Sequence, residues 1–147
     1  KETEKMPKKK TEKPVEQKTD IPKLTVPKDL KERSNNLVQT LITSSPDIKI
    51  ELFDNGEIDG DTITVYDNKQ VIAYRQGLTN KPITLNIKAS EFVPVHEFVM
   101  VANNLDAIPP NTALMVVTTG GKRYEVFMSA DEKKNAKVVI RYEPPEK

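Results

Sequence analysis

Apolar and polar residues alternate in short runs between residues 37 and 142. In the run 82–87, Ile83, Leu85 and Ile87 alternate with Thr84 and Asn86, and this period of two is that of a strand with one buried and one solvated face. Turn-forming residues separate the runs, as in an all-β domain. The pattern predicts nine strands, at residues 37–43, 48–53, 62–66, 70–74, 82–87, 97–102, 112–118, 122–128 and 136–142.

Two of these runs, 98–102 and 113–117, are apolar on both sides, which predicts that they lie at the centre of the core. The residues 67–69 and the pair Gly120-Gly121 each lie between neighbouring runs at hairpin spacing, which indicates antiparallel pairing. The predicted fold class is therefore all-β, an antiparallel β-sandwich of about 7–9 strands preceded by a disordered tail. A closed barrel is the alternative.

Two segments have helical character. Residues 27–33 predict a short helical turn that ends near Asn35 and Asn36. Residues 129–135 open with Ser129 and Glu132 at the spacing of a capping box, which predicts barely more than one helical turn.

The first 33 residues differ in composition from the rest of the chain. They carry 11 basic and 7 acidic residues and no aromatic residue, whereas the remainder carries 12 and 15. A segment so poor in apolar residues cannot offset the entropy cost of ordering. The chain therefore divides into a disordered basic, proline-containing tether, 1–33, and a sandwich domain, 34–147. The mildly acidic body argues against nucleic-acid binding.

Several other classes of protein are disfavoured by what the sequence lacks. No apolar run approaches the ~20 residues needed to cross a bilayer, so no transmembrane segment is expected. Cysteine is absent, which excludes disulfides, thiolate metal sites and cysteine nucleophiles. Because the first residue is Lys, we expect a processed chain whose export signal has been removed.

An acidic segment between two predicted strands suggests a calcium site. Asp54, Glu57, Asp59 and Asp61 offer four carboxylates within eight residues that also contain two glycines, and calcium prefers several oxygen ligands around a sharp bend. The EF-hand template fails because Tyr66 stands where the bidentate Glu should be. The alternative is structural: the aspartates accept hydrogen bonds from nearby backbone amides and fix a tight turn.

Catalytic arrangements have little support. The same carboxylates could form a glycosidase pair, but nothing in their spacing implies a cleft. His96 is the single histidine, and neither a nucleophile elbow nor a phosphate-binding loop occurs. We expect His96 to be a hydrogen-bonded residue at the entrance of a strand, and the protein not to be an enzyme.

A second polar segment, 102–112, could carry binding. Asn103, Asn104 and Asn111 lie in it beside the pair Pro109-Pro110, and loops of this composition can present fixed polar groups to a partner. They serve equally well to close the end of a sandwich through bonds from side chain to backbone. Both interpretations stay open at this point.

An ordered series of motifs resembles a known group of domains. The series comprises residues 54–62, 102–105, 108–115, 122–125, 129–131 and 135–136. It resembles a small β-rich domain of secreted and lipid-anchored envelope proteins of the Bacteroidetes, often found at the C-terminal end of a longer chain. The resemblance covers roughly residues 30 to 142. It departs at Leu105-Asp106-Ala107, where a Gly is expected after Leu.

The resemblance implies a location rather than an activity, since that group has no established function. It implies an extracytoplasmic protein, in the periplasm or on the cell surface, whose tether follows a removed signal or a lipidated cysteine upstream. Asp61-Thr62-Ile63 resembles an acceptor for O-linked sugar in those bacteria, although Thr62 also suits the start of a strand.

The sequence thus predicts a non-catalytic secreted or cell-envelope module that binds an envelope protein or a glycan through its end loops. A structural domain with a calcium-stabilised acidic turn is the alternative. Calcium is the only cofactor that the sequence suggests, and no nucleic-acid partner is expected.

Overall fold

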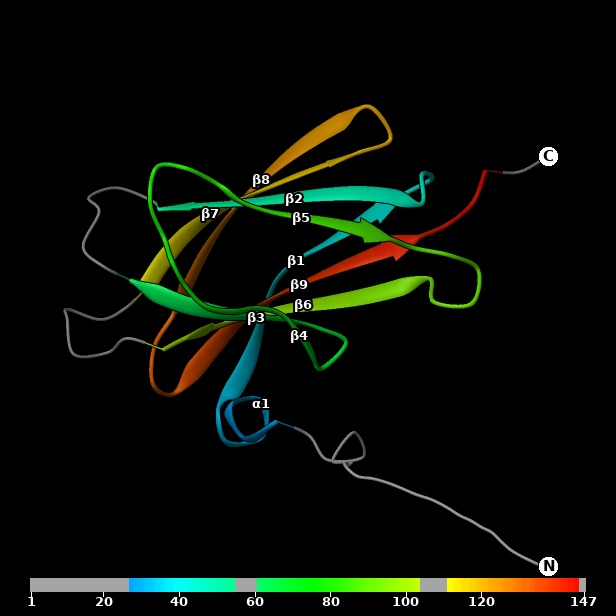
Figure 1. The fold of residues 1–147 in the computed structure, drawn as a ribbon. Helices are drawn as coiled ribbons and strands as arrows, with labels where there is room; N and C mark the ends of the chain where they lie inside the picture. Colours follow the sequence, from blue (N-terminus) through cyan, green and yellow to red (C-terminus); the bar gives the residue numbers. More distant parts are fainter. Residues whose placement is uncertain (1–26, 55–60, 104–110, 146–147) are drawn as a thin grey trace, which may run out of the picture.

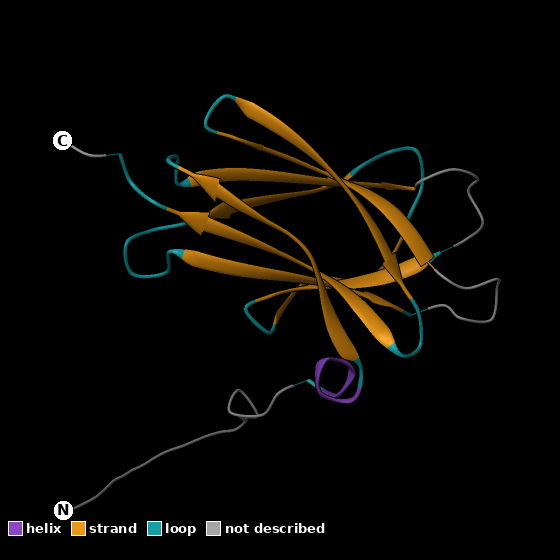
Figure 2. Cartoon of the chain, turned by 180° about the vertical axis from the view of Figure 1, so that it is seen from behind, coloured by secondary structure: helices purple, strands orange, loops and turns teal. Residues whose placement is uncertain are grey.

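The part of the protein that the structure describes is a sandwich of two β-sheets with one short helix (Figures 1 and 2). The computed structural model describes residues 27–54, 61–103 and 111–145; the predicted tether lies mostly outside this part of the chain. The elements are α1 (Lys28–Glu32), β1 (Ser34–Thr43), β2 (Asp47–Asp54), β3 (Thr62–Asp67), β4 (Gln70–Gly77), β5 (Ile83–Lys88), β6 (Val95–Ala102), β7 (Asn111–Thr119), β8 (Lys122–Ala130) and β9 (Lys134–Tyr142).

The strands form a five-stranded sheet, in the order β1-β9-β6-β3-β4, and a four-stranded sheet, in the order β5-β2-β7-β8. The predicted all-β sandwich is confirmed. All neighbouring pairs are antiparallel except β1 and β9, which run parallel. The sequence did not predict this parallel pair. Parallel strands are joined by a long connection and not by a hairpin turn, so no short sequence pattern indicates their pairing.

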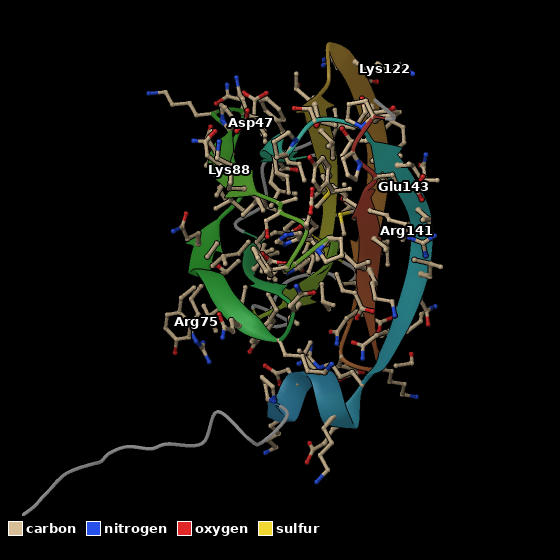
Figure 3. The ribbon with its side chains drawn as sticks, turned by 90° about the vertical axis from the view of Figure 1, so that its right-hand side faces the viewer. Asp47, Arg75, Lys88, Lys122, Arg141 and Glu143 are labelled. Carbon is tan, nitrogen blue, oxygen red and sulfur yellow. The ribbon has the colours of Figure 1, made fainter. Side chains whose placement is uncertain are left out.

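The core forms where the inner faces of the two sheets meet. Along β6, Phe98 and Met100 enter the main core cluster, whereas Val99 lies in a second cluster on the outer face of the same strand. Figure 3 shows the charged side chains placed around the rim of the sandwich, with labels on Asp47, Arg75, Lys88, Lys122, Arg141 and Glu143. The two runs that were predicted to be central correspond to β6 and β7. This prediction is confirmed, because each of these strands has a neighbouring strand on both sides.

Helix α1 covers the outer face of the five-stranded sheet. Its Leu30 packs with Tyr66, Val99 and Val101, which explains why these outward positions are apolar. Burial, and next the nearby Asp29 carboxylate, raises the pKa of the Tyr66 hydroxyl. No helix in the described residues is long and apolar enough to cross a membrane.

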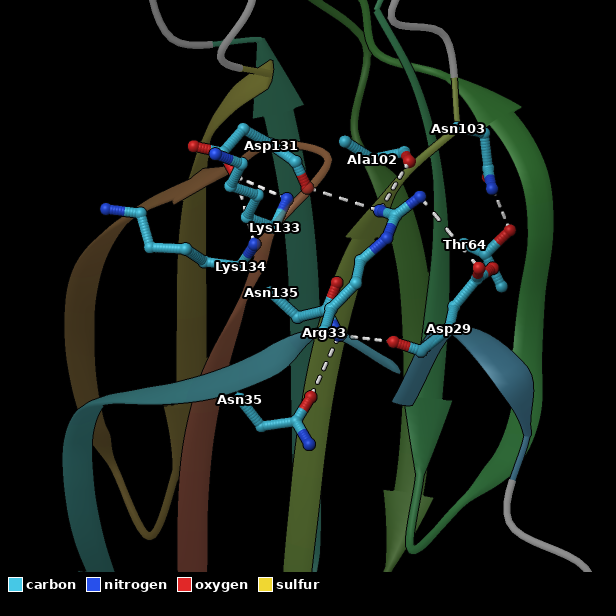
Figure 4. Close-up of polar contacts among 10 residues, drawn as sticks. All are labelled: Asp29, Arg33, Asn35, Thr64, Ala102, Asn103, Asp131, Lys133, Lys134 and Asn135. Atoms are coloured by element: carbon cyan, nitrogen blue, oxygen red, sulfur yellow. Dashed lines mark hydrogen bonds and ion pairs between the residues drawn. The ribbon is translucent and has the colours of Figure 1, made fainter. Parts of the chain in front are cut away.

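Polar contacts fix α1 and the start of β1 to the sheet (Figure 4). One guanidinium nitrogen of Arg33 donates to the carbonyls of Ala102, at 3.0 Å, and Asp131, at 3.2 Å. The buried Asn135 side chain donates to the Asp29 carbonyl at 3.0 Å and to the Asn35 amide oxygen at 2.8 Å. The folded body therefore includes residues 27–33, which the sequence analysis assigned to the tether.

The helix predicted for residues 129–135 is wrong. Ser129 and Ala130 end β8, and β9 begins at Lys134. Between them Asp131 accepts bonds at Oδ1 from the backbone amides of Lys133, at 2.8 Å, and Lys134, at 2.9 Å. The Lys133 amide bond is the main cause of the lowered pKa of Asp131. An aspartate that binds the backbone two and three residues ahead favours a turn over a helix.

At the end of the sandwich near the β7–β8 turn, a buried pair of hydroxyls joins the two sheets. The hydroxyl of Thr119 donates to the Asp47 carbonyl at 2.8 Å, and the hydroxyl of Thr43, 2.8 Å away, donates to Thr119. Thr43 belongs to β1 and Thr119 to β7. The bond between Thr43 and Thr119 therefore holds the edge of one sheet over the middle of the other, and the bond to Asp47 ties Thr119 to its neighbouring strand β2.

Replacing Thr119 with Val keeps the side-chain shape but removes both bonds. We expect the free energy of unfolding to fall by about 1–2 kcal/mol, because the buried Thr43 hydroxyl and the part-buried Asp47 carbonyl lose a partner. Thr118→Val, at the exposed neighbouring position, should change it by less than about 0.5 kcal/mol. Urea unfolding of both variants measures the difference, and equal stabilities would contradict the hydroxyl link.

Candidate functional site

Four strand ends meet at the opposite end of the sandwich (Figure 1). Asp54 is the last residue of β2, Asp61 precedes β3, Asn103 follows β6 and Asn111 begins β7. We call these four residues, together with Thr62, the first residue of β3, the loop-root cluster. The cluster takes in both polar segments that the sequence singled out, and it draws on both sheets.

The carbonyl of Thr62 is the meeting point of this cluster. It accepts the backbone N–H of Asn103 at 2.8 Å and the side-chain amide of Asn111 at 3.0 Å. Asn103 belongs to the five-stranded sheet and Asn111 to the four-stranded sheet, so one acceptor joins both. Asn111 is only 1% exposed, which makes this a buried link between the sheets.

Asp61 makes a second link between the sheets. Its carboxylate accepts the backbone N–H of Thr112, in β7, at 3.4 Å, and its carbonyl accepts the N–H of Leu78 at 2.8 Å. The side chain is 1% exposed. The Asp54 amide donates to the Thr79 carbonyl at 2.9 Å, so the segment after β4 packs along the same end.

A short chain of bonds extends from Asn103 into the sheet. The Thr64 hydroxyl donates to the Asn103 amide oxygen at 2.5 Å (Figure 4). The same hydroxyl accepts the backbone N–H of Arg75 at 3.1 Å. Arg75 has a positive φ of 48°, an uncommon conformation for a residue other than glycine. The Thr64 hydroxyl therefore supports an irregular position of β4.

The structure assigns a bracing role to two of the three asparagines predicted to bind a partner. Asn111 is buried and holds Thr62, and Asn103 holds Thr64 and Thr62. This is the end-closing alternative that the sequence analysis left open. Asn104 lies outside the described residues.

The structure describes only two of the four predicted calcium ligands. Glu57 and Asp59 lie outside the described residues, while Asp54 and Asp61 flank that gap. Asp61 accepts the backbone amide of Thr112, which is distant in the sequence, and the rest of the predicted tight turn lies outside the described residues. The described part of the chain contains no group of three or more acidic or histidine side chains able to hold a metal. The calcium site stays a prediction.

His96 behaves as a structural residue. Its Nδ1 lies 2.9 Å from both carboxylate oxygens of Asp67, and its ring stacks on Phe98 with centroids 5.9 Å apart. The side chain is 5% exposed and lies near the start of β6. The predicted hydrogen-bonded histidine at a strand entrance is confirmed.

Beside the loop-root cluster lies an apolar feature that the sequence analysis missed. Phe53 pairs with Leu114, and Leu114 pairs with Phe127, in the register of β2, β7 and β8. Their inward neighbours Leu52 and Met115 are in the core, so these three side chains lie on the outer face. Phe53 and Leu114 are half-buried and Phe127 is 62% exposed. We call this set the apolar row.

The sequence indicated some of the apolar row, but not that its members lie side by side. Phe53 and Phe127 each occupy the polar phase of an otherwise alternating strand, whereas Leu114 lies in a run that is apolar on both sides. Their adjacency depends on the register of three strands, which alternation alone does not give.

Replacing Asn111 with Ala tests the loop-root cluster. The variant loses the buried bond to the Thr62 carbonyl, so we expect a loss of about 1–2 kcal/mol in the free energy of unfolding. Asn86→Ala, at an exposed position on β5, is the matched control and should stay within about 0.5 kcal/mol of the parent. Urea unfolding monitored by circular dichroism measures both, and an unchanged Asn111→Ala variant would refute the brace.

Comparison of this chain with protein-family models, with curated proteins and with solved structures finds no match. The resemblance to Bacteroidetes envelope domains stays a prediction.

Proposed function

We propose that this chain is a non-catalytic module of the cell envelope that binds another protein through the apolar row of Phe53, Leu114 and Phe127. The row is the single observation on which the proposal depends. Isolated apolar side chains are common on protein surfaces, but neighbouring ones that include aromatics are typical of interfaces. Phe127 is the exposed member and Phe53 flanks Leu114 on the other side.

The position of the row supports a binding role. Phe53 immediately precedes Asp54, and Leu114 follows Asn111 by three residues, so the row adjoins the loop-root cluster. The bonds from Asn111 and Asp61 hold β7 to the opposite sheet. A binding surface on braced strands loses little conformational entropy when a partner docks, which favours affinity.

The chemistry of the row favours a protein over a glycan as partner. Three apolar side chains match the buried centre of a protein interface, where aromatic residues supply most of the binding energy. Polar side chains on the same outer face, among them Glu51, Thr112 and Glu125, flank the row, whereas Asn111 is turned inward to Thr62. The envelope location rests on the sequence resemblance alone.

A photoreactive phenylalanine analogue placed at position 127, in cells that naturally make the protein, tests this proposal. We expect one discrete protein adduct, because this ring is the most exposed member of the proposed contact surface. The control position is Phe92, which is 95% exposed in the segment between β5 and β6 and should give no such adduct.

Other results would contradict the proposal. Identical adducts at positions 92 and 127, or none at 127, would remove the row as a protein-binding surface. A glycan array on which the parent binds a sugar, with binding unchanged in Phe127→Ser, would favour the glycan interpretation instead. Phe127→Ser should keep the parent's melting temperature within a few degrees, because an exposed side chain contributes little to stability.

A further inference from the structure

Strand β1 is an edge strand with an unusual composition. Among the described residues its one neighbour is β9, so the other side of its backbone faces away from the sheet. Its ten residues, SNNLVQTLIT, contain no charge, no proline and no glycine. In Figure 3 it runs along the right-hand margin of the sandwich. Unpaired N–H and C=O groups along such an edge are a template for another strand.

The other three edge strands carry features that discourage pairing. β8 bears Lys122, Arg123 and Glu125, β5 ends in Lys88, and β4 has Arg75 in a positive-φ conformation. Charges and local irregularities are the usual means by which proteins protect exposed edges. β1 has no such charge, and its one irregularity, at Val38, leaves the second half of the strand, residues 39–43, in regular register with β9.

Beyond that bulge the strand is regular and presents apolar side chains outward. Thr40 pairs with Val139 and Ile42 with Arg141, whereas Leu41 pairs with the core residue Ile140. Positions 40 and 42 therefore share the outer face, and Val38 is the bulge residue that precedes this regular part. Val38 is 45% and Ile42 54% exposed, and no core contact accounts for their apolar character.

We propose that β1 pairs antiparallel with β1 of a second copy of this chain, around a two-fold axis beside Thr40. In this register Thr40 lies opposite Thr40, and Val38 lies opposite Ile42 on either side of it. Threonine pairs and pairs of β-branched apolar residues are favourable cross-strand neighbours. The two five-stranded sheets join into one continuous sheet, and the free edge disappears.

The composition of β1 argues for a copy of itself as the partner. A strand that pairs with itself across a two-fold axis places any charge close to that axis opposite or near its own copy, which is destabilising. β1 is the only edge strand in the described structure that avoids this penalty entirely. In the proposed register β1 also places an apolar side chain opposite an apolar side chain on either side of the axis. This association uses a different surface from the apolar row and does not depend on the proposed function.

Charge substitutions at Thr40 test the pairing in the full chain. Thr40→Lys and Thr40→Glu each put two like charges opposite each other at the axis, so each variant alone should dissociate at least about tenfold more readily than the parent. An equal mixture of the two variants places Lys opposite Glu and should restore association to within about threefold of the parent. Analytical ultracentrifugation from about 1 µM to about 1 mM covers the range expected of a small interface.

The matched control is Thr84→Lys, an identical change at an exposed position of edge strand β5, which should leave association unchanged. A parent that stays monomeric over the whole range overturns the proposal. So does a dimer that tolerates both Thr40 variants, since it then uses another surface. Circular dichroism of each variant at the same concentrations confirms that the fold is retained.

Discussion

The carbonyl oxygen of Thr62 is the point on which this end of the molecule depends. It takes one donor from each side of the sandwich, the Asn103 backbone and the buried Asn111 side chain. A buried acceptor without donors is costly, so the sheets are stable only in the arrangement that brings both donors to it. The hydroxyl pair of Thr43 and Thr119 imposes a similar condition at the other end. Hydrophobic burial drives the two sheets together, and these bonds specify how they meet.

Fixing the two ends has consequences for the outer surfaces. Once β2, β7 and β8 are in register, Phe53, Leu114 and Phe127 must lie side by side on the outer face. Likewise the pairing of β1 with β9 decides which side chains of the edge strand point outward. The surfaces that we propose for binding and for self-association are therefore products of the same internal constraints.

The sequence predicted the strands because alternation is a local pattern. It also placed β6 and β7 at the centre, since both faces of those runs are apolar. It failed at residues 129–135, where Asp131 outweighs the capping pattern by binding two backbone amides. It could not foresee the parallel pairing of β1 with β9 or the docking of Leu30 on Val99, because those contacts join residues that are distant along the chain.

For the candidate site, residue type was predictable and orientation was not. Polar residues at the ends of β2, β3, β6 and β7 were expected to matter, yet no pattern tells whether Asn111 faces a partner or the Thr62 carbonyl. That choice depends on the spacing of the two sheets. The apolar row required knowledge of three registers at once. Each surface position became interpretable only after long-range pairing had been established.

Hydrogen exchange of individual backbone amides tests the central claim most directly. The amides of Asn103 and Thr112 donate to Thr62 and Asp61 within the buried end of the sandwich. They should exchange only when that end opens, at least about a thousandfold more slowly than in an unstructured peptide. The amide of Phe92, bonded to the exposed Ser90 hydroxyl, should exchange quickly. Exchange of Asn103 and Thr112 as fast as that of Phe92 would contradict the account.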